Sequence, residues 1–369
     1  MTIRIEQPEA ASDRVLERML ALRDEIYADD DDWCAPTEGE LQRQLRRPGF
    51  AGGRQQILLV RRPGRDVGCA VVRRCKKLEV DGQSVAAIGH FEALHDPEAV
   101  ATLLNTAARW AVDEGSELVL GPMNGDAWHQ FRCNLGPWDE APFVMEPYNP
   151  SYYSELFEQA GFEPFETYQS RRIDDLAGAA RHHRPRWAYA RSLGYRLQSL
   201  DDEASVDAAL DRVYDVLCRS FADQRLYSPM NRETFKRRYG GVKRVLDRDL
   251  SFILVDRAGR DVGLALVVPD YGPALAAMKG RRSLWANAKY LIRRRRNTAN
   301  IQAMAVVPES RGQGLGSAMA HKCYDAIADR GFDCANLCLI ADGNPSAMGI
   351  DGRRGRVLRR YALYRYRAL

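Results

Sequence analysis

Residues 304–320 read MAVVPESRGQGLGSAMA, and this stretch says more about the fold than any other part of the chain. An apolar run over 303–307 ends at Pro308, Arg311 is followed by glycines at 312, 314 and 316, and an apolar-periodic segment continues to 328. This order predicts a strand, a glycine loop and a helix. Glycines let the backbone approach a bulky anion, and the N–H groups at a helix N-terminus point at negative charge. With Arg311 as a fixed cation, the loop is predicted to hold a pyrophosphate.

Two common nucleotide-binding loops do not fit this stretch. It lacks the Gly-Lys-Ser/Thr end of an ATP-binding P-loop, and its G-x-G-x-G spacing differs from the Rossmann G-x-G-x-x-G. The run RGQGLG at 311–316 instead resembles the coenzyme A loop of the GCN5-related N-acetyltransferase (GNAT) superfamily, Q/R-x-x-G-x-G/A. The alternative is a glycine-rich turn without a ligand. The resemblance implies acyl-CoA as co-substrate, bound by Ala305, Val306, Val307, Arg311, Gly312, Gln313, Gly314, Leu315, Gly316, Ser317 and Asn344.

Composition sets broad limits on the protein. A chain of 369 residues is long enough for two domains, and 45% hydrophobic with 28% charged residues is typical of a globular protein. No run is long enough to span a bilayer, and residues 1–17 lack the apolar core of a signal peptide. Eight cysteines without a C-x-x-C motif predict reduced thiols in a cytoplasm and no structural zinc or other metal. The net charge of +4 does not imply nucleic acid as a partner.

The chain contains an internal repeat. LLVRRPGRDVG at 58–68 is matched by ILVDRAGRDVG at 253–263, and each copy predicts a β-hairpin with a glycine turn. After the first copy the pattern predicts a strand at 85–94, a helix at 97–114 and a strand at 118–120. After the second it predicts a strand at 301–307, a helix at 316–330 and a strand at 335–340, with earlier helices at 206–221 and 232–246.

We therefore predict an α/β protein of two tandem acetyltransferase-like domains, each a mixed, mostly antiparallel sheet flanked by helices. The predicted limits are 1–173 for the first domain, 174–201 for a linker and 202–369 for the second domain.

The two halves are not equivalent. In place of the glycine loop the first half has HDPEAV at 95–100, with two acids that would repel a pyrophosphate. The first domain is predicted to lack a coenzyme A loop.

Several strings in the first half resemble a bacterial branch of double-domain GNAT-like proteins. They are IGHFE at 88–92, GPMN at 121–124, PYNPSYY at 147–153 and LFEQAGF at 156–162, together with PDYGPAL at 269–275 in the second half. Some bacterial ceramide synthases look like this branch, which raises a long-chain, sphingoid-type lipid amine as one acceptor. The resemblance covers about residues 50–369, but Gly272 replaces the usual polar residue after Pro-Asp. It suggests Asn124, Asn149, Tyr152 and Tyr153 as substrate-binding residues. For Asn149, Tyr152 and Tyr153, helix capping by asparagine or serine is an explanation nearly as good.

Acyl transfer from a thioester to an amine needs a deprotonated amine, a donor for the carbonyl oxygen and a proton for the thiolate. In the GNAT superfamily the strand before the glycine loop supplies a backbone N–H to the carbonyl, which implies Val306 or a neighbour here. The usual acid, a tyrosine about seven residues after Asn344, is absent, because position 351 is aspartate. The candidate catalytic residues are Glu92, Asp270 and Tyr271. The alternatives are a structural carboxylate for Glu92 and a turn-forming Pro-Asp for Asp270.

Residues 279–296 (KGRRSLWANAKYLIRRRR) combine eight basic residues with aromatic and aliphatic ones. This composition suits an interfacial helix on anionic lipid, with a solvated helix face as the alternative. An RNA-binding surface is disfavoured because the aromatics lack a stacking motif.

The sequence thus predicts a cytoplasmic acyl-CoA-dependent N-acyltransferase that acts on an amine, with a peripheral contact to an anionic membrane through 279–296. One rival is a non-catalytic double-domain protein that senses acyl-CoA or binds a ligand. The others are a small-molecule N-acetyltransferase and a transferase that uses aminoacyl-tRNA.

Overall fold

The computed structural model describes residues 2–34, 38–46, 54–203, 205–240, 246–278, 297–344 and 354–366. The basic segment 279–296 lies outside these residues. The first half contains β1 (Arg4–Glu6), α1 (Asp13–Ile26), α2 (Glu38–Arg46), β2 (Gln55–Arg62), β3 (Arg65–Val80), β4 (Gln83–Ala93), α3 (Pro97–Asp113), β5 (Leu118–Gly121), β6 (Cys133–Asn134), α4 (Tyr153–Gln159) and β7 (Phe162–Ile173).

The remaining elements follow in a similar order. They are α5 (Leu176–Ser192), β8 (Arg196–Ser199), α6 (Val206–Phe221), α7 (Arg232–Tyr239), β9 (Phe252–Val255), β10 (Asp261–Pro269), α8 (Gly272–Ala276), β11 (Thr298–Val306), α10 (Leu315–Asp329), β12 (Cys334–Ala341) and β13 (Arg356–Tyr366).

Most predicted elements are confirmed. The helices predicted at 97–114, 206–221 and 316–330 are α3, α6 and α10, each within one residue at either end, and the four predicted strands are β4, β5, β11 and β12. The two repeat copies are the hairpins β2–β3 and β9–β10, where Gly64 and Gly259 adopt φ of 85° and 82° in the turns. The helix predicted over 232–246 ends earlier, since α7 stops at Tyr239 before Gly240.

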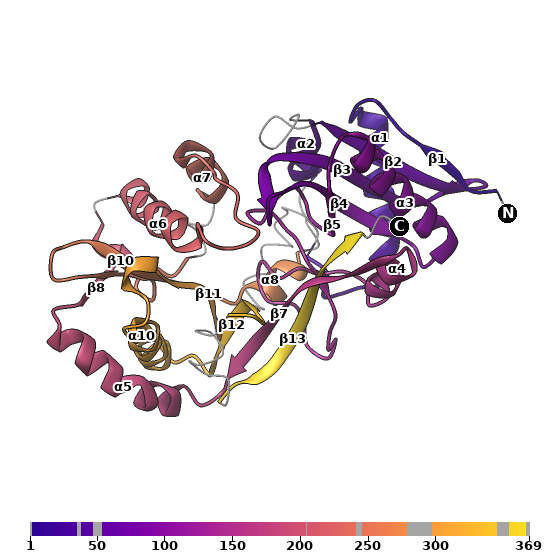
Figure 1. Cartoon of the computed structure of the whole chain (residues 1–369). Helices are drawn as coiled ribbons and strands as arrows, with labels where there is room; N and C mark the ends of the chain where they lie inside the picture. The colour runs from indigo at the N-terminus through magenta and orange to yellow at the C-terminus, as the bar shows by residue number, and fades with distance from the viewer. Residues whose placement is uncertain are drawn as a thin grey trace.

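One sheet runs through the whole molecule in the order β1-β2-β3-β4-β5-β13-β7-β12-β11-β10-β9-β8 (Figure 1), with β6 paired to β13. Its pairs are antiparallel except β4–β5 and β11–β12, which are parallel. The order is symmetric about the central β13–β7 pair, with five strands of one half on each side. The predicted mixed, mostly antiparallel sheet flanked by helices is confirmed.

The two halves exchange their last strands. The C-terminal strand β13 pairs with β7 over 356–366 and with β5 over 364–366, so it lies within the sheet of the first half. In return, β7 pairs with β12 of the second half. Figure 1 shows this crossing at the centre of the molecule, where yellow β13 lies along magenta β7. The sheet thus continues across the domain limits predicted at 173 and 202, and those limits stay a prediction.

Helices cover both faces of each half. In the first half, α3 packs its alanine and leucine face on β2, β3 and β4, while α1 packs on the opposite face of β3 and β4. In the second half, α6 lies on one face of the sheet and α10 on the other (Figure 1).

The segment 174–201, predicted as a linker, forms regular structure. Asp175 caps α5 by accepting a hydrogen bond from the Gly178 nitrogen at 2.7 Å, and β8 pairs with β9 at the sheet edge. Alanines at 179, 180 and 190 are buried on α5, and small side chains let α5 and α10 approach closely. The ring of His321 on α10 lies 2.8 Å from the Ala180 carbonyl oxygen. The segment therefore packs as part of the second half (Figure 1).

In the described part of the chain, none of the helices has the length and apolar character that a bilayer span needs. All eight cysteines fall within that part, and each is a free thiol.

Candidate functional site

The glycine loop joins β11 to α10 as the sequence predicts. Gly312 and Gly314 adopt φ of 79° and 75°, in the left-handed region that favours glycine. Gly314 is also the N-cap of α10, and it offers no side chain to accept hydrogen bonds from the first N–H groups of that helix. The loop and the first turn of α10 therefore present backbone donors to an anion.

A cavity of about 380 Å³ opens between this loop and α5. Its walls are the loop and first-turn residues Gly312, Gln313, Gly314 and Ser317 on one side, and the α5-side residues Arg186, Tyr189 and Leu193 on the other. The hydroxyl of Tyr195 donates to the Gln313 side-chain oxygen at 2.8 Å and ties the loop to the chain after α5.

Arg311 does not line this cavity. Its guanidinium forms an ion pair with Asp223, just after α6, and donates to the Ser220 carbonyl oxygen at 2.6 Å. Its Nε donates to the Val306 carbonyl oxygen at 3.2 Å. Arg311 thus braces the loop against α6, and the pyrophosphate contact predicted for it stays a prediction.

The other predicted cofactor residues surround the loop. Ala305 and Val306 end β11, while Val307 and Leu315 are buried in the core of the second half. Gly316 and Ser317 lie in the first turn of α10, and the Asn344 nitrogen donates to the Ala341 carbonyl oxygen at 3.0 Å just after β12. The apolar side chains among these predicted cofactor residues shape the loop, so that any contact with a ligand would be made by the loop backbone.

The strand before the loop is open on one side. β11 and β12 pair in parallel only from Thr298 to Ile301 on β11, whereas β12 stays paired with β7 along its other edge as far as Ala341. The stretch 302–306 consequently leaves its partner strand before reaching the loop. Such a splay exposes backbone groups at the edge of the strand.

The same place in the first half is filled by protein. β4 and β5 pair only over Val85–Ala87 of β4, and the side-chain oxygen of Asn124 then accepts a hydrogen bond from the His90 nitrogen at 2.6 Å. The backbone passes closely enough at Gly89 that a Cβ there would lie 2.2 Å from the Met123 carbonyl oxygen. Asn124, predicted to bind substrate, thus closes the splay of β4 and β5.

Two tyrosines complete this closure. The Ala93 nitrogen donates to the Tyr153 hydroxyl at 2.9 Å, and the Tyr152 hydroxyl donates to the Ala93 carbonyl oxygen at 2.8 Å. Ala93 pairs with Gly68, and Val306 pairs with Gly263 in the second copy of the repeat. Ala93 and Val306 therefore occupy equivalent positions. Both backbone groups of Ala93 are therefore occupied by tyrosine hydroxyls, whereas at Val306 the carbonyl oxygen accepts from Arg311.

The helix after β4 is capped by an acid instead of opening onto a glycine loop. The Asp96 carboxylate accepts a hydrogen bond from the Ala99 nitrogen at 3.2 Å and pairs with the Arg62 guanidinium at 2.8 Å. The Arg62 guanidinium holds the pKa of Asp96 below its usual value. A carboxylate already occupies the anion position at the N-terminus of α3.

Glu92 belongs to the closed site of the first half. Its carboxylate accepts a hydrogen bond from the Tyr153 hydroxyl at 2.8 Å. Burial raises the pKa of Glu92 to about 7, while Tyr153 and the Arg23 charge oppose that rise. Glu92 pairs with Cys69 as Ala305 pairs with Leu264, so Glu92 is the first-half equivalent of Ala305. Glu92 therefore lies in the half that has no glycine loop.

Asp270 and Tyr271 lie at the end of β10, in the half that carries the glycine loop. One Asp270 oxygen accepts hydrogen bonds from the Val144 and Gly272 nitrogens, both at 3.0 Å. Burial raises the pKa of Asp270. The Gln302 side chain donates to the Val144 carbonyl oxygen at 3.0 Å, so a loop of the first half is clamped over β10 and β11. Tyr271 is buried against Val144.

The close approach of that loop explains why glycine follows Pro-Asp-Tyr. A Cβ on Gly272 would lie 2.4 Å from the Pro142 carbonyl oxygen. Asn149 fixes the same loop further along, since its side chain accepts from the Asn134 nitrogen at 2.7 Å and donates to the Pro150 carbonyl oxygen at 2.8 Å. The binding roles predicted for Asn124, Asn149, Tyr152 and Tyr153 stay predictions beside these structural ones.

Glu146 is a residue that the sequence analysis missed. It is buried, accepts a hydrogen bond from the Phe143 nitrogen at 2.9 Å and a second one from the Tyr361 hydroxyl, and lies 3.4 Å from the Arg359 Nε. Burial raises its pKa to about 7 despite the Arg359 charge. No motif marks it, because its partners come from β13, more than two hundred residues later in the chain.

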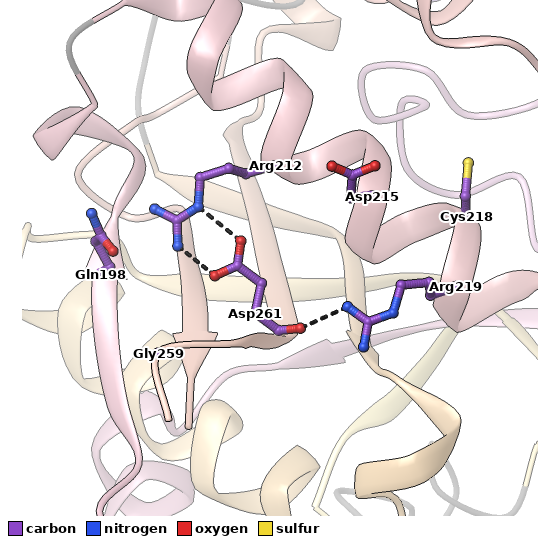
Figure 2. A pocket seen from close by; sticks show the side chains of 7 residues that line it. All are labelled: Gln198, Arg212, Asp215, Cys218, Arg219, Gly259 and Asp261. Atoms are coloured by element: carbon purple, nitrogen blue, oxygen red, sulfur yellow. Dashed lines mark hydrogen bonds and ion pairs between the residues drawn. The ribbon is translucent and has the colours of Figure 1, made fainter. Parts of the chain in front are cut away.

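A second, wider hollow of about 660 Å³ lies beside α6 and the β9–β10 turn (Figure 2). Arg212 forms two hydrogen bonds with the Asp261 carboxylate, at 2.6 and 2.8 Å, and Arg219 donates to the Asp261 carbonyl oxygen at 2.9 Å. Both arginines in this hollow are thus already bound to Asp261, as the dashed lines in Figure 2 show. Its walls contain none of the glycine-loop residues 312–317.

Comparison with known families agrees with the geometry of the second half. Residues 210–350, which include most of α6, the open splay and the glycine loop, match the model of the acetyltransferase (GNAT) family. This match lies within the second half of the chain. Members of this family use acetyl- or acyl-CoA.

Solved structures show the same overall architecture as this chain. A tandem GNAT protein from the clavulanic acid biosynthesis pathway aligns with a TM-score of 0.53 and 13% identity, over 99% of this chain and 98% of that one. A GCN5-related N-acetyltransferase from Sphaerobacter thermophilus aligns with a TM-score of 0.50 and 14% identity, over 98% and 95%. The predicted fold of two tandem acetyltransferase-like domains is confirmed.

A third structure is larger than this protein. It contains a GCN5-related glucosamine N-acetyltransferase region of a fungal multi-domain GH3 β-N-acetylglucosaminidase, with a TM-score of 0.55 and 13% identity. The alignment covers 99% of this chain and 38% of that one. At such identities these likenesses show the fold alone. Among curated protein sequences, none matched this chain.

Proposed function

We propose that the protein is an acyl-CoA-dependent N-acyltransferase whose second domain binds the acyl-CoA. The observation that carries the proposal is the contrast between two equivalent places in the repeat. After β11, two left-handed glycines and an uncapped α10 lie beside a cavity of about 380 Å³. After β4, Asp96, Tyr152 and Tyr153 occupy the corresponding groups.

In the proposed reaction the amine nitrogen attacks the thioester carbonyl carbon, the carbon–sulfur bond breaks, and an amide and coenzyme A thiol result. The proton lost by the nitrogen ends on the thiolate. Backbone N–H groups of 302–306, on the strand edge that β12 leaves, would donate to the carbonyl oxygen and polarise it. Holding the amine and the acyl-CoA together in one site would supply much of the remaining increase in reaction rate.

Among the three candidate catalytic residues, the structure favours Asp270 over Glu92 as the base. Asp270 follows β10, which pairs directly with β11, whereas Glu92 lies in the closed half. Tyr271 packs in an apolar cluster with Val144 and Val268, which suits a positioning role better than proton transfer.

The acceptor is an amine, and a long-chain lipid amine stays a prediction that rests on the sequence. The basic and aromatic segment that suggested it, 279–296, lies outside the described residues. If it contacts lipid, the protein should sediment with anionic vesicles, and raised salt or serine at positions 293–296 should release it. Full activity on acetyl-CoA with a small polyamine, and no vesicle binding, would leave a small-molecule N-acetyltransferase.

A coupled experiment separates the enzyme from the non-catalytic alternative. The protein is incubated with acetyl-, hexanoyl- or palmitoyl-CoA and a panel of primary amines, while free thiol is measured and amide products are identified by mass. Thermal unfolding is followed with each acyl-CoA alone, because a bound ligand raises the unfolding temperature. Stabilisation together with amide formation supports the proposal. Stabilisation without turnover on any amine supports an acyl-CoA sensor, and no stabilisation contradicts both.

A further inference from the structure

Helix α5 is an unusually basic element beside the glycine loop. It carries Arg181, Arg184, Arg186 and Arg191 but no aspartate or glutamate within its bounds, 176–192. All four arginines are exposed, and none forms an ion pair with any residue that the structure describes. Elsewhere near the loop, arginines are neutralised, since Arg311 pairs with Asp223 and Arg219 pairs with Glu309.

One of these arginines reaches the loop itself. A Cβ built on Gly314 would lie 3.4 Å from the Cδ of Arg186 and 3.8 Å from its Nε and Nη1. Arg186 also lines the cavity that Gly312, Gly314 and Ser317 border. Its guanidinium therefore faces the same space as the backbone N–H groups of the loop. A guanidinium beside backbone donors is a common arrangement for binding phosphate oxygens.

The cavity also has an apolar side. Tyr189 and Leu193 line it, and their exposed fractions of 55% and 42% are high for residues of their type. A cavity with a cation and N–H groups on one side and an exposed ring on another suits a nucleotide, which carries both phosphates and a flat base.

We propose that Arg186 of α5 faces the coenzyme A site and binds the pyrophosphate there, the role that the sequence analysis gave to Arg311. This inference rests on the proposed binding of acyl-CoA to the second domain. It assigns phosphate recognition to a helix that the sequence analysis treated as a linker. Tyr189 would then lie against the adenosine part of the same ligand.

Calorimetric titration of the full-length protein with coenzyme A and with dephospho-coenzyme A tests the proposal. Arg186→Ala should weaken both ligands at least tenfold, because both contain the pyrophosphate, and Arg186→Lys should recover part of the loss. Arg184→Ala is the matched control, since Arg184 is exposed on the same helix and does not line the cavity. It should bind within about twofold of wild type, and because Arg186 is exposed, thermal unfolding of the Arg186 variants without ligand should match wild type.

The outcomes separate this inference from the proposed function. Wild-type binding with no loss in Arg186→Ala, or equal losses in Arg186→Ala and Arg184→Ala, would overturn the inference and leave the coenzyme A site intact. A loss for coenzyme A that vanishes with dephospho-coenzyme A would place Arg186 at the 3′-phosphate and would overturn the pyrophosphate assignment. A wild type that binds neither ligand would overturn the inference and the proposed function together.

Discussion

The hydroxyl of Tyr153 lies 2.9 Å from the backbone nitrogen of Ala93 and 2.8 Å from the carboxylate of Glu92. It therefore accepts one hydrogen bond and donates another at the end of β4, where the equivalent strand of the second half is open toward the glycine loop. The two halves share a chain path and a sheet register. They differ in what fills the space after the parallel strands diverge.

This contact predicts the effect of removing one oxygen atom. In Tyr153→Phe the Ala93 nitrogen loses its partner and the Glu92 carboxylate loses a donor, so unfolding should become easier by about 1–3 kcal/mol. Tyr152→Phe should cost less, because Tyr152 is only half-buried and the Ala93 carbonyl oxygen has a second lone pair. Urea denaturation measures both. Coenzyme A affinity should stay at the wild-type level in each, and a loss of affinity in Tyr153→Phe alone would place the ligand in the first half.

Stability should depend on pH through Glu92. Its pKa in the folded protein is raised to about 7 from a usual value of 4.5. The folded state thus holds the proton more tightly than the unfolded state, and this contribution is present below pH 4.5 and is lost as pH rises toward 7. Glu92→Gln cannot ionise, so its stability relative to wild type should increase over this window, on the order of 3 kcal/mol.

Denaturation curves of wild type and Glu92→Gln at several pH values provide the measurement. Glu146, with a pKa also raised to about 7, contributes to the wild-type curve with the same sign. Comparing the two proteins removes that shared contribution. A constant difference between them from pH 4.5 to 8 would show that Glu92 ionises normally.

The candidate bases differ in expected effect on catalysis. Asp270→Asn keeps an oxygen that can accept from the Val144 and Gly272 nitrogens, so the loop should stay clamped while the base is lost. We expect kcat to fall 10²-fold or more, as is typical of a lost general base. Glu92→Gln should change kcat much less, because Glu92 lies in the other half. Steady-state kinetics with saturating acyl-CoA checks this, and the reverse order of effects would exchange the two roles.

Local sequence pattern predicted the repeated elements well. The hairpins at 58–68 and 253–263 and the helices α3, α6 and α10 follow from periodicity and turn residues within a few positions of one another. The glycine loop was identified for the same reason, since its spacing is a property of adjacent residues.

The sequence pattern did not predict which strands pair when they lie far apart in the chain. Nothing in the residues of β13 indicates that it inserts between β5 and β7, because any strand with apolar residues on both faces suits a sheet centre. Helix α5 was missed because its buried face consists mostly of glycine and alanine, which give a weak apolar signal. The ion pair of Arg311 with Asp223 joins residues 88 positions apart, and so its partner could not be read from the loop.

The most direct test of the account is acyl-CoA affinity in two matched glycine variants. Gly314 and Gly331 have φ of 75° and 77° at opposite ends of α10, and a Cβ on Gly331 meets nothing within 4 Å. Gly314→Glu and Gly331→Glu therefore carry similar backbone strain and the same added charge, but only the first lies at the cavity. Calorimetry with acetyl-CoA should show binding abolished or weakened at least a hundredfold in Gly314→Glu and near wild type in Gly331→Glu. Native affinity in Gly314→Glu would contradict the assignment of the coenzyme A site to the second half.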